Sequence, residues 1–485
     1  MRRFFVKNIL FVVAVNLLVK PVWTLLIDRS VQNKVVGGQY GTYQALLSLS
    51  IIFQIVLDFG ITSYNSRTIA QNPEKLPTLF PSMLSARLVL MGLYMVLAYS
   101  WALLLGYNGR ELLLLLGILL FQSLNSLLSF IRSNIAALHR FKTDGILSIT
   151  DRLLAIVICG VLLLYPATAN NFKIEWFVAT QVASYLVTAV AAYLVLRRIA
   201  GVKLQFVLHA PTILGIIKQS LPYALLIFQM SVYNRADAMM IERMCANGKM
   251  QADIWASAFR LLDMANMFGL MFATMLLPLY GRMLSNKQDV QPIVKLCGNL
   301  MLPLSFVVAI AGIIFSADIM HLLYKGAKTS GAHEYQIVFS WLMASFPAWC
   351  IMYIYSTLLT ANGNLKALNY IAFGGVLFNL LLNFYLIPRY EAVGGAITSF
   401  FTQTLLSLAF AAACARILKL QTNIKWILAL LGYLSFAIIL AYGTITFVQV
   451  NWLLQAAVFF GVSTLMLFVF RFVSVSGIKQ LANRE

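Results

Sequence analysis

Long apolar segments recur along the whole chain and are separated by short polar connections. A helix needs about 20 predominantly apolar residues to cross the hydrocarbon core of a bilayer. Measured against that length, the sequence predicts fourteen transmembrane helices at 8–27, 41–64, 81–106, 111–138, 146–166, 174–196, 213–240, 252–281, 291–315, 335–361, 367–387, 392–415, 424–448 and 451–472. The first segment lacks a small-residue cleavage site after a short apolar core, so we expect it to remain as the first helix.

The composition supports an all-α integral membrane protein. Hydrophobic residues make up 61% of the 485 residues, charged residues make up 11%, and the mean hydropathy is +0.84, whereas charged side chains form about a quarter of a soluble globular chain. The connections are too short to hold a soluble catalytic domain. No metal-binding or nucleotide-binding motif is present, and the five cysteines show no CxxC spacing, so we expect no metal, no cofactor and no enzymatic activity.

Lysine and arginine are distributed unequally between the two sides of the predicted bundle. With the N-terminus inside, 22 of them fall in cytoplasmic segments and nine in outer segments. This asymmetry predicts that both termini are cytoplasmic. Most of the net charge of +20 therefore reflects topology, and we expect no nucleic-acid partner.

Among the charged side chains within the predicted spans we single out five basic and three acidic ones, because a charge at bilayer depth costs roughly 2.5–3.5 kcal/mol. The basic ones are Lys20, Arg87, Arg132, Arg235 and Arg260, and the acids are Asp58, Asp237 and Asp263. Such groups pair with one another or line a water-filled cavity. An excess of cations favours an anionic passenger, and a pyrophosphate is a group that lysine and arginine bind well.

Several roles for these charges stay open. Arg260, Asp263 and Asn266 share one helical face, and they either line a cavity or act as a paired packing device. Arg235 and Asp237 point in different directions on a regular helix, which makes mutual pairing the weaker explanation. Arg87 and Arg132 lie near the cytoplasmic face, where long side chains can snorkel to the headgroups, or they belong to the cavity. Asp58 could pair with Lys20, carry a proton or help to bind a cation.

Proline interrupts several predicted spans, at Pro21, Pro222, Pro303 and Pro347. Each proline frees a backbone carbonyl and permits a bend. Pro21 directly follows Lys20, so a hinge there would move that cation.

Two strings carry a resemblance to a known family. Gly41-Thr-Tyr43-Gln-Ala followed by Leu57-Asp58-Phe59-Gly60 and Arg67 is similar to a G-x-Y-x-x-A motif with a D-F-G-like turn and an arginine. The segment from Asn379 through Asn383 and Pro388 to Gly394-Gly395-Ala396 is similar to N-x-x-L-N-x-x-L-I-P-x-x-G-x-x-G-A, except that Glu391-Ala392 stands where a glycine is usual. The chain thus resembles the lipid-linked oligosaccharide flippases of the polysaccharide transporter family. Their superfamily also holds multidrug and toxin extrusion (MATE) proteins and the peptidoglycan lipid II flippase.

The resemblance implies a MATE-like fold of two pseudo-symmetric six-helix lobes plus two C-terminal helices. The lobes would cover residues 1–200 and 201–418, and the additional helices would cover 419–485. It also implies cavity-lining roles for Arg260 and Asp263, which match an arginine and an acid in the corresponding helix of the lipid II flippase.

From the charges and the resemblance together we expect a flippase that moves an undecaprenyl-pyrophosphate-linked oligosaccharide outward by alternating access, for O-antigen, capsule or exopolysaccharide synthesis. We expect a monomer in the bacterial inner membrane, in contact with membrane lipids and with other polysaccharide-assembly proteins. Lys20, Arg235 and Arg260, with Arg87 and Arg132, would form the cationic cavity, and the three acids would set arginine geometry or couple transport to Na⁺, H⁺ or the membrane potential. The alternatives are a MATE-type drug/cation antiporter, which should have an acid-rich cavity, and a polytopic glycan polymerase or ligase.

Overall fold

The computed structural model describes residues 19, 22–35, 38–59, 61, 62, 65, 69, 73–138, 140–169, 171–202, 204, 205, 207, 210–324, 332–421, 424–447, 451–470 and 472. Within these ranges every regular element is a helix and no strand occurs. Ten of the helices in this described part are long and apolar enough to cross a membrane. The predicted all-α membrane fold class is therefore confirmed, and the number fourteen stays a prediction.

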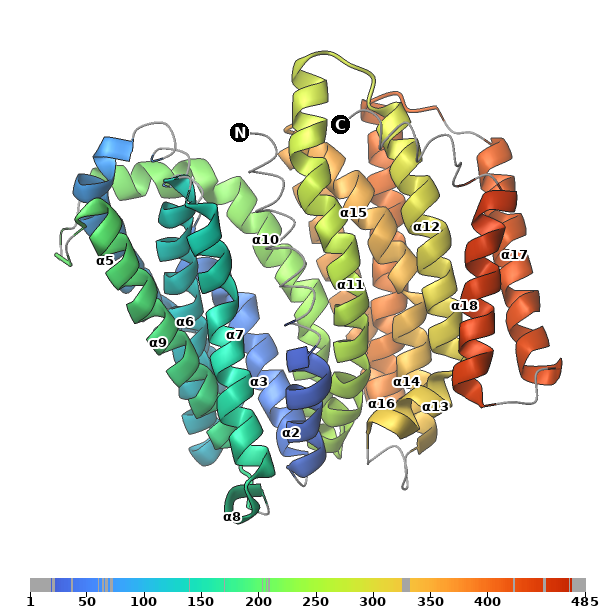
Figure 1. Cartoon of the computed structure of the whole chain (residues 1–485), viewed down its shortest axis with the longest axis horizontal. Helices are drawn as coiled ribbons and strands as arrows, with labels where there is room; N and C mark the ends of the chain where they lie inside the picture. Colours follow the sequence, from blue (N-terminus) through green and yellow to red (C-terminus); the bar gives the residue numbers. More distant parts are fainter. Residues whose placement is uncertain are drawn as a thin grey trace. The chain divides into compact units, whose positions relative to one another are not determined.

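The chain divides into two compact units, Met1–Asp253 and Ile254–Glu485. In the first unit, coloured blue to green in Figure 1, the elements are the π-helix η1 (Trp23–Asp28), α2 (Arg29–Lys34), α3 (Gln39–Phe53), the 3-10 helices η2 (Gln54–Leu57) and η3 (Pro73–Lys75), α5 (Leu76–Leu104), α6 (Gly109–Ala137), α7 (Phe141–Leu164), α8 (Pro166–Ala169), α9 (Ile174–Ala200) and α10 (Ala210–Met244). Helix α11 (Gly248–Ser285) begins in this unit and continues into the second.

The second predicted span is shorter than the hydropathy pattern suggests. The α-helix α3 gives way to η2, and the chain then turns at Asp58 and Phe59, where Phe59 takes a positive φ of 40°. Asp58 and Phe59 therefore form a turn that ends the helix, and Asp58 sits at this break rather than within a continuous span.

Helix α10 packs along α3, and the start of α11 lies against the same helix. A Cβ added at Gly41 would lie 2.2 Å from the carbonyl oxygen of Lys249 and 2.6 Å from the amide nitrogen of Asp253, so only glycine permits this approach. Gln32 adds a side-chain hydrogen bond of 2.9 Å from its Nε2 to Asp253 Oδ1. Because α10 packs on α3, it belongs to the first compact unit. The boundary between the two units therefore falls one helix after the predicted lobe boundary at residue 200.

The second unit contains the rest of α11 and then α12 (Gln291–Ile314), α13 (Ser316–Leu323), α14 (Ala332–Ala344), α15 (Phe346–Ala361), α16 (Leu365–Ile417), α17 (Ile424–Phe447) and α18 (Trp452–Val469). Pro347 stands in the first turn of α15, directly after the break between α14 and α15 at Ser345. The helices α10 and α12 continue through Pro222 and Pro303. Helices α17 and α18 pack on α12 through a core that includes Val307, Tyr433 and Phe459.

Helix α16 is two helices joined by a sharp reversal, which matches the two spans predicted there. Glu391 has φ 50° and ψ −129°, a conformation that is not helical. A Cβ added at Gly394 would meet the carbonyl oxygen of Leu386 at 2.4 Å, so the two segments touch directly at the reversal. Further along, Asn379 Nδ2 donates to Thr402 Oγ1 at 3.4 Å. The segments therefore run antiparallel, and Glu391 occupies the reversal itself.

Candidate functional site

Arg260 of α11 is a deeply placed cation of the second unit. Its side chain is buried, with 7% of the residue exposed. Nη1 donates a 3.0 Å hydrogen bond to the hydroxyl of Tyr324, and Cζ lies 5.7 Å from the centroid of the same ring. Tyr324 is itself buried. Its hydroxyl and ring therefore hold the Arg260 guanidinium in one orientation.

Asp263 and Asn266 continue the stripe that Arg260 begins on α11, as the spacing predicts. Asp263 is half-buried and Asn266 is buried. Among the described residues, neither the amide nitrogen nor the amide oxygen of Asn266 has a hydrogen-bond partner. A buried amide without partners costs roughly 1–3 kcal/mol, and native structures normally satisfy such groups with water or a ligand. The stripe on α11 is therefore suited to contact with a polar molecule.

Arg235 and Asp237 lie on α10 in the first unit. Arg235 is half-buried, whereas Asp237 is completely buried. Two residues apart on a helix, the side chains leave the backbone in different directions. The predicted roles of the two residues in a cavity stay predictions.

Arg87 does not snorkel to a membrane surface, and that interpretation is wrong. Its guanidinium is buried and bonded on both sides: Nη2 donates to Asp58 and to the Thr62 hydroxyl, and Nη1 donates to Ser126 through the carbonyl oxygen at 3.0 Å and Oγ at 2.9 Å. Cζ also lies 4.8 Å from the ring centroid of Phe130. Arg87 is thus a partner of Asp58 that the sequence did not indicate, and the predicted roles of Asp58 toward Lys20, a proton or a cation stay predictions. This pair joins the end of η2 to α5 and α6.

Arg132 of α6 forms an ion pair with Asp144 of α7, with 2.8 Å between Nε and Oδ1. About a quarter of each side chain is exposed. On the predicted topology the pair links the cytoplasmic ends of two consecutive helices. The predicted roles of Arg132 at the headgroups or in the cavity stay predictions.

Aromatic and charged side chains form a cluster around Arg152 that the hydropathy pattern did not indicate. Its Cζ lies 5.3 Å from the ring centroid of Trp23 and 5.6 Å from that of Tyr185, and Nε lies 3.5 Å from Asp151 Oδ2. Helix α7 begins at Phe141, so Arg152 is three turns inside the helix, in agreement with the predicted span 146–166. The π-helix η1, which brings Trp23 to this cluster, is the kind of local distortion that occurs often at functional sites.

A second network was also missed, at the predicted outer ends of α6, α10 and α11. Tyr107 donates its hydroxyl hydrogen to Glu242, and Arg243 stacks on the Tyr107 ring with 3.3 Å between Cζ and the centroid. Glu111 accepts a 2.6 Å hydrogen bond from Lys249. Burial and the neighbouring Glu242 carboxyl group raise the pKa of the Tyr107 phenol, which therefore acts as a hydrogen-bond donor at neutral pH.

Lys20 and Pro21 lie outside the described residues, so the predicted hinge and the first cation of the cavity stay predictions. Arg235 and Arg260 belong to different compact units, and their predicted convergence also stays a prediction. Within the described residues no group of three or more His, Cys, Asp or Glu side chains could hold a metal ion.

Sequence comparison places residues 5–284 within a family described as polysaccharide biosynthesis protein. No curated protein matches the chain by sequence.

Three solved structures show the fold to which the chain is similar. The lipid II flippase MurJ in an inward closed conformation aligns with a TM-score of 0.73 at 15% identity, over 96% of this chain and 98% of that one. An inward-facing multidrug resistance MATE family transporter of the MOP superfamily aligns with a TM-score of 0.61 at 13% identity, over 81% and 94%. The Vibrio cholerae MATE transporter VcmN in the bent form aligns with a TM-score of 0.54 at 17% identity, over 86% and 97%. The predicted MATE-like fold is thereby confirmed.

Proposed function

Because the chain belongs to the polysaccharide biosynthesis protein family, we propose that it is a flippase that moves a lipid-linked oligosaccharide from the cytoplasmic to the outer leaflet. The family supplies the pathway class, and the fold is the one seen in the lipid II flippase MurJ and in MATE transporters. The substrate is an oligosaccharide on undecaprenyl pyrophosphate, made for a surface polysaccharide such as O-antigen, capsule or exopolysaccharide. The protein acts in the bacterial inner membrane with both termini in the cytoplasm.

The stripe on α11 is the observation that carries this proposal. It combines a buried guanidinium, Arg260, with a buried amide, Asn266, that has no hydrogen-bond partner among the described residues. A guanidinium presents a planar set of donors that matches phosphate oxygens. An amide can donate to the sugar hydroxyls or to a phosphate next to them. The stripe thus offers the two kinds of contact that a glycosyl pyrophosphate requires.

Transport proceeds by alternating access, with Lys20 and Arg235 joining Arg260 at the pyrophosphate while the prenyl tail stays outside the charged cavity, on the apolar side of the protein. Asp237 and Asp263 orient the cations or couple the cycle to Na⁺ or H⁺. An inside-negative potential favours the outward movement of an anion by roughly 2.3 kcal/mol per charge per 100 mV. The membrane potential alone can therefore supply a driving force.

A MATE-type antiporter is the second candidate, and the alignment with MATE transporters favours it. The two functions predict opposite charge selectivity at α11. Arg260 repels a cationic drug and attracts a pyrophosphate, so uptake of organic cations into vesicles separates the candidates.

The first test replaces Arg260 by alanine and by lysine in cells that depend on the protein for surface polysaccharide. Arg260→Ala abolishes export, and Arg260→Lys retains part of it because the positive charge remains. Arg389→Ala is the matched control, since Arg389 is exposed at the reversal of α16 and bonds to Tyr385. Membrane levels of all variants are measured by immunoblot. Undiminished export by Arg260→Ala at normal membrane level would remove the basis of the proposal.

A further inference from the structure

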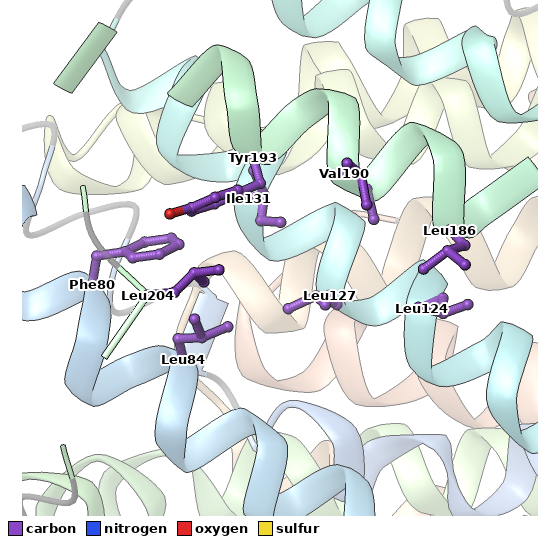
Figure 2. A pocket seen from close by; sticks show the side chains of 10 residues that line it. Phe80, Leu84, Leu124, Leu127, Ile131, Leu186, Val190, Tyr193 and Leu204 are labelled. Carbon is purple, nitrogen blue, oxygen red and sulfur yellow. The ribbon is translucent and has the colours of Figure 1, made fainter. Parts of the chain in front are cut away.

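Two apolar cavities lie along the pair formed by α6 and α9. The first has a volume of about 170 Å³ and is lined from three helices, with Phe80 and Leu84 from α5, Leu124 and Ile131 from α6, and Tyr193 from α9. Figure 2 shows these side chains facing the same space, together with Leu204 from the segment after α9. On the predicted orientation this cavity lies in the cytoplasmic half of the membrane.

The second cavity, of about 440 Å³, continues along the same helix pair toward the predicted outer side. Leu186 lines both cavities, so they adjoin. Small residues, Gly117, Ala179 and Ala183, line the second cavity. A Cβ at Gly117 would meet Val178 Cγ1 at 2.7 Å, which shows how closely the two helices approach there. The two cavities follow one face of α9 from Glu175 to Tyr193, and we call them together the α6–α9 groove.

The groove is longer than one leaflet of a bilayer. Between Glu175, which lines its outer end, and Tyr193, which lines its inner end, α9 advances about 27 Å at 1.5 Å per residue. One leaflet contributes only about 15 Å of a hydrocarbon core about 30 Å thick. The acyl chain of a single phospholipid stays within its own leaflet, whereas a long polyisoprenyl chain can follow the groove from end to end.

Cationic side chains stand at both ends of the groove. At the inner end, Arg197 is exposed and follows Tyr193 by four residues, so the two share one face of α9. Helix α9 ends directly afterwards at Gly201, whose φ of 62° and hydrogen bond of 2.8 Å to the Arg197 carbonyl oxygen close the helix. At the outer end, Arg110 Nη2 donates to Glu175 at 3.0 Å and to Gln39 at 3.2 Å, and it is largely exposed. A phosphate-bearing headgroup would thus meet a guanidinium at the inner end, whereas at the outer end Arg110 is already paired with the Glu175 carboxylate.

We propose that the α6–α9 groove binds the polyisoprenyl tail of the lipid-linked substrate, with Arg197 receiving the pyrophosphate at the cytoplasmic end. This inference rests on the proposed function and adds a place for the tail that the charged stripe on α11 does not provide. The tail lies in the groove while the headgroup is loaded from the cytoplasmic side.

Photocrosslinking of the full-length protein tests the groove directly. We place p-benzoylphenylalanine at Ala183, which lines the groove, or at Val187, which is exposed on α9 but lines neither cavity. Both proteins are reconstituted in vesicles of phosphatidylethanolamine and phosphatidylglycerol that contain tritiated undecaprenyl phosphate. We expect several-fold stronger labelling from position 183 than from position 187. Equal labelling at the two positions, or equally strong labelling of position 183 by tritiated phosphatidylglycerol at the same mole fraction, would overturn the proposal.

The contribution of Arg197 is measured by competition in the same vesicles. Unlabelled undecaprenyl pyrophosphate displaces the tritiated probe from position 183, and Arg197→Gln weakens this competition about tenfold, as expected for the loss of one charge-assisted contact. Arg198→Gln is the matched control, because it removes the same charge from another face of the same turn. Equal competition in the two variants would overturn the assignment of Arg197.

Translocation separates this proposal from the proposed function. The double variant Ala179→Trp/Ala183→Trp places two indole rings in the second cavity of about 440 Å³, where the labelling experiment adds only one side chain. Val187→Trp/Leu194→Trp adds the same bulk to exposed positions of α9 that line neither cavity, and melting temperatures confirm that both variants are folded. We expect Ala179→Trp/Ala183→Trp to lose most translocation of a lipid-linked oligosaccharide and Val187→Trp/Leu194→Trp to retain it. If wild type translocates and Ala179→Trp/Ala183→Trp does so equally well, the groove proposal fails and the flippase stands. If position 183 is labelled selectively while wild type translocates nothing, the flippase fails and the tail site stands.

Discussion

Arg87 and Asp58 form a buried ion pair whose removal should destabilise the first compact unit. The pair connects the end of η2 to α5, and Ser126 of α6 accepts further hydrogen bonds from the same guanidinium. Replacing Arg87 by methionine keeps an unbranched apolar stem but leaves Asp58 without its cationic partner. Breaking a buried pair in this way costs about 3–5 kcal/mol.

The structure places the expected loss at the lower end of that range. The Arg87 side chain is 2% exposed, but the Asp58 side chain is 34% exposed and retains access to solvent. It also keeps the 3.0 Å hydrogen bond from the Thr62 amide. We therefore expect a loss of about 3 kcal/mol for Arg87→Met, which for a unit of this size corresponds to a fall in melting temperature of roughly 6–12 °C.

Thermal unfolding of the detergent-solubilised protein, followed by tryptophan fluorescence, measures this loss. Arg132→Met is the matched control, because the Arg132 side chain is 24% exposed whereas that of Arg87 is 2% exposed, so Arg132→Met should cost clearly less than Arg87→Met. In the double variant Asp58→Asn/Arg87→Met the buried charge is gone, so its loss should be smaller than the sum of the two single losses by about 1–3 kcal/mol. Additive losses, or equal melting of Arg87→Met and Arg132→Met, would refute the reasoning.

Three further predictions concern single contacts. Glu391→Gly should raise the free energy of unfolding by about 1 kcal/mol, because glycine adopts the positive φ of the α16 reversal without strain; a lower melting temperature would contradict this. Tyr107→Phe should lower the free energy of unfolding by about 1–3 kcal/mol, because it removes the hydrogen-bond donor to buried Glu242. The double variant Glu242→Gln/Tyr107→Phe should recover part of this free energy. Because the Arg110–Glu175 pair is exposed, Arg110→Ala should lower the free energy of unfolding by less than about 1 kcal/mol. High salt should reduce the difference in melting temperature between this variant and wild type.

Much of the helical framework was predictable from hydropathy because each span must satisfy its own backbone hydrogen bonds in lipid. The predicted edges of α9 and α12, for example, lie close to those of the structure, with the largest departure at the C-terminal end of α9. The departures occur where local backbone geometry depends on tertiary packing. The turn at Asp58 ends a helix within an apolar run, and nothing in the hydropathy pattern marks it. Gly41 was noticed as part of a motif, but its physical reason, contact with the backbone of α11, required the fold.

The charged residues were identified from sequence, but their partners were not. Arg87 lies near a predicted cytoplasmic end, and position along the chain favoured snorkelling over an ion pair with a residue 29 positions earlier. Arg152 lies within the predicted span 146–166 but was not singled out with the other intramembrane charges. Its position inside that span was the signal available for it. The apolar groove on α6 and α9 has no sequence signature, since its lining residues look like any lipid-facing surface.

Translocation in vesicles tests the central claim most directly. Purified protein is reconstituted with a fluorescent oligosaccharide on undecaprenyl pyrophosphate, and the fraction of the label exposed to a membrane-impermeant quencher is followed with and without an inside-negative potential. The flippase account predicts transfer to the outer leaflet that the potential accelerates and that Arg260→Ala abolishes. Transfer no faster than in protein-free vesicles, or equal transfer by wild type and Arg260→Ala, would contradict it.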